Sequence, residues 1–237
     1  MTLLDFEGDY GRDYNARIRS LIPGYDAIQE IAAAALRGLK PDARSVLVVG
    51  PGSGMELPGL FDAMPKARFT LVEPSAQMRG FCSALIEQLG AAERVQWGPP
   101  SLETADAMVE GSALDQSFDA VVSHNVLHVL APAQQQELLQ QMAARLAPGG
   151  CLLLSSYSES PGCNLKLWMA IARARFAALG LDAQTVNEVM ASRNTKVFSM
   201  DPVRLEQTLL EAGLEAPVVL VQALFNRLWL IQRGAER

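Results

Sequence analysis

The stretch Ser45-Val-Leu-Val-Val-Gly-Pro-Gly-Ser-Gly54 decides the fold that this sequence predicts. A short valine-rich run, typical of a buried β-strand, leads directly into three glycines at alternate positions. Glycine adopts conformations that other residues avoid, so the chain can turn tightly there and a ligand can approach the main chain. An amphipathic stretch near 55–63 follows. We therefore expect a strand, a glycine turn and a helix, in that order.

An acidic residue closes the next apolar run. Phe69-Thr-Leu-Val72 has strand character, and Glu73 follows it, nineteen residues after Gly54. A carboxylate at the end of the second strand can accept hydrogen bonds from the hydroxyls of a ribose. The glycine turn and the acid together predict a site for a cofactor that contains adenosine. The alternative interpretation is a glycine-rich turn that binds no ligand.

The spacing of the glycines indicates which adenosine cofactor fits. Dinucleotide sites use G-x-G-x-x-G, because the third glycine lets the helix pack closely while its N-terminus holds a pyrophosphate. Here the third glycine, Gly54, comes one residue earlier, and Glu56 at the helix start would repel a pyrophosphate. A nicotinamide cofactor is therefore the less favoured alternative. The pattern resembles motif I of the class I S-adenosylmethionine (SAM) methyltransferases, whose cofactor has no phosphate.

Composition sets the outer limits of the interpretation. The chain has 237 residues, 49% of them hydrophobic, which suits one domain with a sizeable core. Cysteines Cys82, Cys151 and Cys163 are scattered, which predicts a reducing cytoplasm as the location. We expect no signal peptide and no transmembrane helix. The net charge of -6 argues against nucleic acid as a partner.

Apolar runs alternate with helical patterns, which predicts an α/β fold with a parallel sheet and helices on both faces. The strand candidates are 45–49, 69–72, 94–97, 118–123, 150–155, 217–222 and 227–232. The amphipathic stretches between them lie near 55–63, 75–89, 133–146 and 202–212. Pro148-Gly-Gly150 is expected to end the stretch near 133–146, with a glycine in the left-handed cap position.

Two segments stand outside this alternation within a single predicted domain, 1–237. The N-terminal segment, residues 1–40, has helical character that Pro23-Gly24 should interrupt. The insert, residues 156–200, contains two more helical stretches, one of them near 182–192. Ligands of such folds bind outside the carboxyl ends of the strands, where the insert begins. We expect a lid and a cap; the alternative for the insert is extra packing on the sheet edge.

The order of landmarks resembles class I SAM-dependent methyltransferases over nearly the whole chain. Four motifs carry the resemblance: Val46-Leu-Val-Val-Gly-Pro-Gly-Ser-Gly54, Leu71-Val-Glu-Pro-Ser-Ala-Gln-Met78, Ser117-Phe-Asp-Ala-Val-Val-Ser-His-Asn-Val-Leu-His128 and Leu146-Ala-Pro-Gly-Gly-Cys-Leu-Leu-Leu154. The resemblance implies a Rossmann-like seven-stranded mixed sheet of order 3-2-1-4-5-7-6 with an antiparallel last strand. It also implies SAM as the cofactor.

A narrower resemblance covers the two ends of the chain. Ile18-Arg-Ser-Leu-Ile-Pro-Gly-Tyr-Asp-Ala-Ile28 is similar to the N-terminal segment of carboxy-SAM synthases and their methyltransferase relatives. Leu209-Leu-Glu-Ala-Gly-Leu and Val221-Gln-Ala-Leu-Phe-Asn-Arg-Leu are similar to their C-terminal run. The group often folds its N-terminal segment over bound SAM, and some members form homodimers, so both are expectations for this chain.

The resemblance assigns cofactor contacts residue by residue. Those implied by the motifs and the N-terminal segment are Tyr25, Arg19, Gly50, Pro51, Gly52, Glu73, Pro74, Met78, Ser101, Leu102 and Asn125. Two positions depart from the family. Val48 stands where relatives carry an acid near the methionine end of SAM, and Trp97-Gly-Pro-Pro-Ser-Leu102 lacks the aspartate that contacts adenine. Backbone atoms or Ser101 would have to replace that aspartate.

The candidate catalytic residues are Tyr157, Asn125, His128 and Tyr14. A histidine can act as a general base near neutral pH, although many relatives use this histidine only to line the cofactor pocket. Asn125 can accept a hydrogen bond from the amino group of SAM. Tyr14 and Tyr25 can close over the sulfonium, with cation–π contact, or can belong to an ordinary amphipathic helix. We predict no metal, because His124 and His128 have no recognisable third ligand.

Three functions remain open at the level of sequence. The first is methyl transfer from SAM to a small-molecule metabolite, which needs mainly positioning and desolvation. The second is a reaction of SAM without methyl transfer, either carboxy-SAM synthesis or cyclisation to azetidine-2-carboxylate with release of methylthioadenosine. Val48 fits cyclisation, because an amine without a carboxylate partner is easier to deprotonate. The third is a SAM-binding protein without catalysis.

Overall fold

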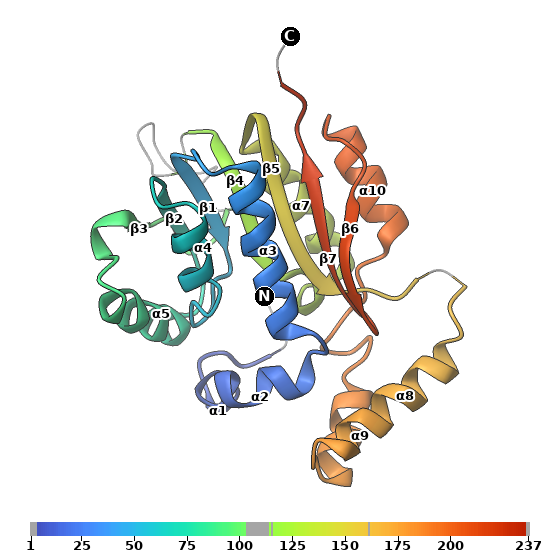
Figure 1. Cartoon of the computed structure of the whole chain (residues 1–237). Helices are drawn as coiled ribbons and strands as arrows, with labels where there is room; N and C mark the ends of the chain where they lie inside the picture. Colours follow the sequence, from blue (N-terminus) through green and yellow to red (C-terminus); the bar gives the residue numbers. More distant parts are fainter. Residues whose placement is uncertain (1–3, 103–113, 115, 161, 236–237) are drawn as a thin grey trace.

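The computed structural model describes residues 4–102, 114, 116–160 and 162–235. Its centre is a seven-stranded sheet of order β3-β2-β1-β4-β5-β7-β6, as the resemblance implies (Figure 1). The strands are β1 Ser45–Val49, β2 Arg68–Val72, β3 Val95–Trp97, β4 Phe118–His124, β5 Leu146–Tyr157, β6 Val218–Ala223 and β7 Asn226–Gln232. Strands β1 to β5 pair in parallel, and β7 runs antiparallel to both β5 and β6. The predicted fold class is therefore confirmed.

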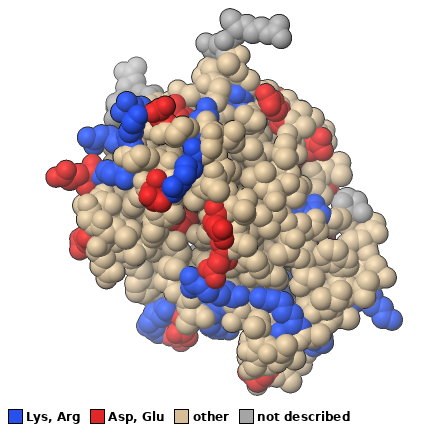
Figure 2. Space-filling model, viewed as in Figure 1, with Lys and Arg blue, Asp and Glu red and all other residues tan. Residues whose placement is uncertain are grey.

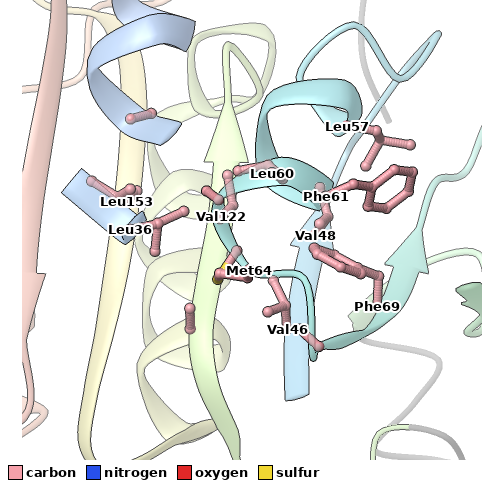
Figure 3. Close-up of a cluster of buried hydrophobic side chains, with 14 of the residues drawn as sticks. Leu36, Val46, Val48, Leu57, Leu60, Phe61, Met64, Phe69, Val122 and Leu153 are labelled. Atoms are coloured by element: carbon pink, nitrogen blue, oxygen red, sulfur yellow. The ribbon is translucent and has the colours of Figure 1, made fainter. Parts of the chain in front are cut away.

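Helices cover both faces of the sheet, and strand β1 shows why. Its side chains alternate, so Val46 and Val48 enter one apolar cluster while Leu47 and Val49 enter another. The first cluster packs against α3 (Tyr25–Leu39), α4 (Leu57–Ala63) and α5 (Ala76–Gln88), and part of it is drawn in Figure 3. The second packs against α7 (Pro132–Ala144) and α10 (Pro202–Glu211). A run that is apolar at every position thus predicts a strand buried on both sides.

The expectation for Pro148-Gly-Gly150 is wrong. Helix α7 ends at Ala144, and β5 already begins at Leu146, so these residues lie within the strand. The pairing register between β4 and β5 shifts there. A side chain at Gly150 would meet the Phe118 carbonyl oxygen at 3.1 Å. The glycines therefore permit an irregular, close approach of two strands and do not cap the helix.

From residue 4 onward, where the structure describes it, the N-terminal segment contains three helices. They are α1 (Asp9–Arg12), α2 (Tyr14–Leu21) and α3, and the expected break at Pro23-Gly24 separates α2 from α3. Gly24 has a φ of 71°, a left-handed conformation that suits glycine. The described part of the segment turns back toward the ends of β1 and β2 before α3 packs on the sheet (Figure 1).

The insert forms helices α8 (Leu165–Ala178) and α9 (Ala183–Ala191), which lie at one end of the sheet beside the N-terminal segment (Figure 1). A small apolar cluster joins Phe176 and Val186 to Phe225 at the start of β7. The guanidinium of Arg175 donates to the Ser20 carbonyl oxygen at 2.6 Å. It thereby satisfies a carbonyl in the last turn of α2 and ties the insert to the N-terminal segment.

No helix within the described ranges is both long and apolar enough to cross a membrane.

We predict opposite effects on stability for two glycine-to-alanine substitutions. Gly50 has a φ of 69°, and a side chain there would meet Val126 Cγ2 at 2.4 Å. Gly50→Ala should therefore lower the free energy of unfolding by about 2–4 kcal/mol, from strain and overpacking together. Gly38 lies near the end of α3 with open space around it, so Gly38→Ala should raise stability by about 0.5–1 kcal/mol. Urea denaturation measures both, and equal effects would contradict the geometry of the turn.

Candidate functional site

The carboxyl ends of β1 and β2 meet at the glycine turn. Gly50, Gly52 and Gly54 all have positive φ, at 69°, 55° and 81°. The Gly50 N–H donates to the Val72 carbonyl at 2.8 Å, and the Gly54 N–H donates to the carbonyl of Pro51 at the same distance. The turn therefore has the backbone conformation that its glycines predict.

Glu73 joins the two strand ends. Its Oε2 accepts from the Gly52 N–H at 2.9 Å, and its Oε1 accepts from the Ser75 N–H at 3.0 Å. The side chain is buried, and burial raises the pKa of the carboxyl although both backbone N–H groups act in the opposite direction. Each carboxylate oxygen keeps a further lone pair that a ribose hydroxyl could use.

Two other residues that were predicted to contact the cofactor, Pro74 and Met78, follow Glu73 in the sequence. Met78 is buried below the turn, and its Cε lies 3.3 Å from where a side chain at Gly52 would begin. Ser75 caps α5 by accepting from the Met78 N–H at 3.1 Å. Pro74, in contrast, is exposed.

The N-terminal segment lies directly on this site. Asn15 Oδ1 accepts from the Ser53 hydroxyl at 2.5 Å. The Glu7 carboxylate accepts from the Ala76 N–H at 2.7 Å, at the positive N-terminal end of α5. The Phe6 carbonyl accepts from Gln77 Nε2 at 3.0 Å. Three hydrogen bonds between groups far apart in the sequence thus hold the segment over the glycine turn.

Glu56 is a buried acid whose place in the site the sequence analysis did not foresee. It immediately precedes α4 and is 7% exposed. Burial raises the pKa of its carboxyl to about 8, and the charge of Glu73 acts in the same direction. Glu56 in turn contributes to the raised pKa of Tyr14 and Tyr25, after burial itself. No ion pair of Glu56 occurs among the described residues.

The structure shows the surroundings of two other residues that the sequence analysis singled out, Arg19 and Val48. Arg19 forms an exposed ion pair with Asp26 at 2.9 Å and lies over the ring of Tyr25. Its guanidinium therefore already has a carboxylate partner. Val48 is fully buried in the apolar cluster between the sheet and α3 and α4. An acid at this position would be buried in that cluster.

The segment after β3 contributes mainly packing. The Gly98 N–H donates to the Leu71 carbonyl at 2.8 Å, which extends the pairing with β2. Leu102 is 1% exposed in the second apolar cluster, and Ser101 is half-buried. The guanidinium of Arg79 lies 4.5 Å from the ring centre of Trp97.

Strand β4 ends in a second strained turn. Asn125 has a φ of 60°, which is uncommon for a residue other than glycine. Its Oδ1 is buried and has no hydrogen-bond partner among the described residues. His124 is buried beside it, with Nδ1 3.0 Å from the Ser155 hydroxyl. Such strain and an unsatisfied buried acceptor both indicate a functional position.

A cavity of about 300 Å³ lies between the N-terminal segment and the insert. Most of its lining is apolar, from residues such as Ile18, Met169 and Phe176. Two predicted catalytic residues, His128 and Tyr157, also line it. The structure thus divides the predicted residues between the glycine turn, where Tyr14 and Asn125 lie, and this cavity.

Burial lowers the pKa of His128 to about 4, so its ring is neutral near pH 7. The Tyr157 backbone N–H donates to His128 Nδ1 over a long 3.5 Å. The Ser156 hydroxyl lies at the same distance from Nδ1. A backbone N–H can only donate, so its contact with Nδ1 favours the tautomer whose proton is on Nε2.

Tyr157 is held by a network that the sequence did not reveal. Its hydroxyl donates to Glu159 Oε1. Arg193 forms a bidentate pair with the same carboxylate, at 2.5 and 2.6 Å. Burial and the neighbouring Glu159 raise the pKa of Tyr157, so its hydroxyl stays protonated. Glu159 and Arg193 stand thirty-four positions apart, and no local pattern predicts their contact.

No group of three histidine, cysteine, aspartate or glutamate side chains within the described residues could hold a metal ion.

Comparison with known proteins gives a match to one family model and shows a fold shared with solved structures. Residues 47–152 match a family model described as a methyltransferase domain. A search of curated proteins finds no match. The structure is similar to that of an O-methyltransferase family protein from Burkholderia thailandensis, with a TM-score of 0.65, 18% identity and coverage of 98% of this chain and 64% of that one.

Two further solved structures are similar. Magnesium protoporphyrin IX methyltransferase from Synechocystis PCC 6803, with bound SAH, has a TM-score of 0.67, 17% identity and coverage of 97% of each chain. The mitomycin 7-O-methyltransferase has a TM-score of 0.61, 17% identity and coverage of 88% of this chain. At these identities the likeness is one of fold.

The chain spans 64%, 57% and 53% of the length of the first three solved structures that it matches. The narrower resemblance to carboxy-SAM synthases stays a prediction. The sheet order, the motif I turn with Glu73 and the family match all agree. Residues 47–152 therefore match a methyltransferase domain, and the sheet of the chain has the strand order that the resemblance to class I SAM-dependent methyltransferases implies.

Proposed function

We propose that the protein transfers the methyl group of SAM to a small-molecule metabolite. The observation that carries the proposal is the cavity of about 300 Å³ beside the glycine turn. Helix α2 takes part in both places, because Tyr14 lies near Glu56 and Glu73 while Arg17 lines the cavity. A cofactor site and a separate apolar cavity on the same side of the sheet are what a two-substrate reaction requires.

The residues around the glycine turn fit SAM. Glu73 would accept from the ribose hydroxyls, and the main chain of Gly50 and Gly52 would run beside the cofactor. The unpartnered Oδ1 of Asn125 would accept from the SAM ammonium. Glu56 would offer the negative charge that relatives place at position 48, from a different element. A cationic ligand would relieve the cost of burying its carboxylate.

The N-terminal segment supplies the cover. Asn15 and Glu7 already hold it against the ends of β1 and β2. Tyr14 and Tyr25 are protonated, because burial raises the pKa of both. Their rings would face the sulfonium as neutral aromatic surfaces and exclude water. SAM would supply the electrophilic methyl group; the chain's own residues position the two reactants.

On the acceptor side, His128 and Tyr157 would orient the nucleophile. Protonated Nε2 of His128 would donate a hydrogen bond to an acceptor oxygen, and Nδ1 is occupied by the Tyr157 N–H. This arrangement favours orientation by His128 over proton abstraction. Glu159 and Arg193 would fix the Tyr157 ring at the cavity wall. Positioning of this kind is the main requirement of methyl transfer.

Cyclisation of SAM is the second candidate. Glu56 favours it, because a carboxyl with a pKa of about 8 can exchange a proton with the SAM amine near neutral pH. The buried Val48 also removes the usual acid. Cyclisation has no acceptor, so it does not require the cavity. In carboxy-SAM synthesis the cavity would hold the donor of the carboxyl group. Methyl transfer therefore remains the first proposal.

Product analysis separates these chemistries. Purified protein should leave SAM nearly unchanged when it is incubated alone, and should form S-adenosylhomocysteine when a metabolite extract is added. Mass spectrometry identifies the nucleoside. Methylthioadenosine formed from SAM alone, above the spontaneous background, would contradict methyl transfer, and azetidine-2-carboxylate formed with it would establish cyclisation.

Two variants control the product analysis. Glu73→Ala removes the ribose contact and should weaken SAM binding by about 1.5–3 kcal/mol, with product formation falling at low SAM. Glu137→Gln changes an exposed acid on α7 and should change nothing. Equal loss in both variants would indicate a general defect of the protein instead of a lost contact.

The raised pKa of the Glu56 carboxyl predicts that the stability of the protein depends on pH. Between its ordinary pKa and about 8, the folded state keeps the Glu56 proton while the unfolded state has lost it. Stability of the ligand-free protein therefore falls as pH rises through this range. Glu56→Gln removes the titration, so from about pH 5 to about pH 8 it should gain roughly 1–3 kcal/mol relative to the wild type. Urea denaturation at both pH values measures this gain.

Glu137→Gln serves again as the control and should follow the wild type at both pH values. SAM should stabilise the wild type more at the higher pH, where its ammonium meets an ionised Glu56, and this increment should shrink in Glu56→Gln. Parallel pH curves for the wild type and Glu56→Gln would refute the buried, cation-binding role of this carboxyl.

A further inference from the structure

The wall of the cavity between α2, α8 and α9 combines apolar surface with unpaired positive charge. Arg17 from the N-terminal segment and Lys196 from the insert both line it. Neither side chain forms an ion pair within the described residues. Arg193 also lines the cavity, but Glu159 already neutralises it. The two free cations therefore stand on opposite structural elements that meet at one cavity.

Glu188 also lines the cavity, from α9, and its Oε1 accepts from Gln184 Nε2 at 3.0 Å. It forms no ion pair with Arg17 or Lys196 among the described residues, and the lining has more basic than acidic side chains. The chain as a whole carries a net charge of -6, so a cationic rim runs against its overall charge. Figure 2 shows Lys and Arg side chains gathered where the N-terminal segment and the insert lie side by side.

A buried donor points to the same chemistry. Asn226, at the start of β7, lines the cavity and is 4% exposed. Its Nδ2 is buried and has no hydrogen-bond partner among the described residues. An unsatisfied buried donor costs about 1–3 kcal/mol, so its retention suggests a ligand that accepts. An oxygen acceptor on the ligand would satisfy it.

We propose that the cavity binds an apolar organic acid, and that this acid is the methyl acceptor. The hydrocarbon part packs against Ile18, Met169 and Phe176, while the anionic oxygens lie between Arg17 and Lys196. Asn226 donates to an oxygen of the ligand. The identity of this ligand as acceptor rests on the proposed methyl transfer; its binding as an anion does not.

The position of the two cations gives the ligand a second effect. Arg17 belongs to the segment that covers the cofactor site, and Lys196 belongs to the insert. A bound anion attracts both cations, so it draws the N-terminal segment and the insert together. This attraction adds to the hydrogen bond that Arg175 donates to α2. The acceptor would thus tighten the closure that SAM begins, and water would be excluded most fully when both reactants are bound.

A pair of fluorescent probes tests the charge requirement. 8-Anilinonaphthalene-1-sulfonate is an apolar anion, and N-phenyl-1-naphthylamine has the same rings without the sulfonate. Titration followed by fluorescence should show tighter binding of the anion to the wild type. Arg17→Gln and Lys196→Gln should each weaken the anion about three- to tenfold, and change the neutral probe less than about twofold. Added salt should weaken only the anion.

Lys166→Gln is the matched control, because Lys166 is an exposed lysine of α8 that does not line the cavity. It should leave both probes unchanged. Equal affinity of the wild type for the two probes would overturn the proposal and place the dye on exposed apolar surface. Unchanged affinity for the anion in Arg17→Gln and Lys196→Gln would do the same. Calorimetry with SAM on the wild type and the same variants separates the two claims. If the wild type does not bind SAM, the proposed function is refuted, while the anion site is not.

Discussion

The two hydrogen bonds of the Glu73 carboxylate hold the functional end of the molecule together. They join the glycine turn after β1 to the start of α5 after β2, and burial removes competing water from both. Gly50 and Gly52 have positive φ angles, and their N–H groups donate to the Val72 carbonyl and to the Glu73 carboxylate. The N-terminal segment then docks on the same two loops through Asn15 and Glu7. Every proposed contact with the cofactor depends on this junction.

Two segments that do not belong to the alternating fold complete the site. The N-terminal segment covers the glycine turn, and the insert closes a cavity against it. Arg175 links them through a carbonyl of α2. Such an arrangement assigns the common part of the reaction to the sheet and the specific part to the added helices. Acceptor choice would therefore depend on Arg17, Lys196 and their neighbours, while cofactor binding depends on the strand ends.

The sequence predicted the sheet well because its signals are local. Valine-rich runs, glycine spacing and Glu73 lie within short windows, and six of the seven strands were expected within one residue of their observed bounds, whereas β5 begins four residues earlier than expected. Pro148-Gly-Gly150 was misjudged, because a glycine pair suits a helix cap and a strand irregularity equally. Glu56, Asn226 and the Arg193–Glu159 pair could not be assigned, since their importance comes from burial and from partners distant in sequence. The departure at Val48 was visible in the sequence, as was its burial within a valine-rich strand.

The central claim is that the N-terminal segment and the insert close over bound SAM. Hydrogen exchange followed by mass spectrometry, with and without SAM, tests it most directly. The account predicts that SAM slows exchange in α1, α2, α8 and α9 more than in strands β1 and β4, which are already protected by pairing. Protection confined to the glycine turn, with unchanged exchange in both the N-terminal segment and the insert, would contradict the claim.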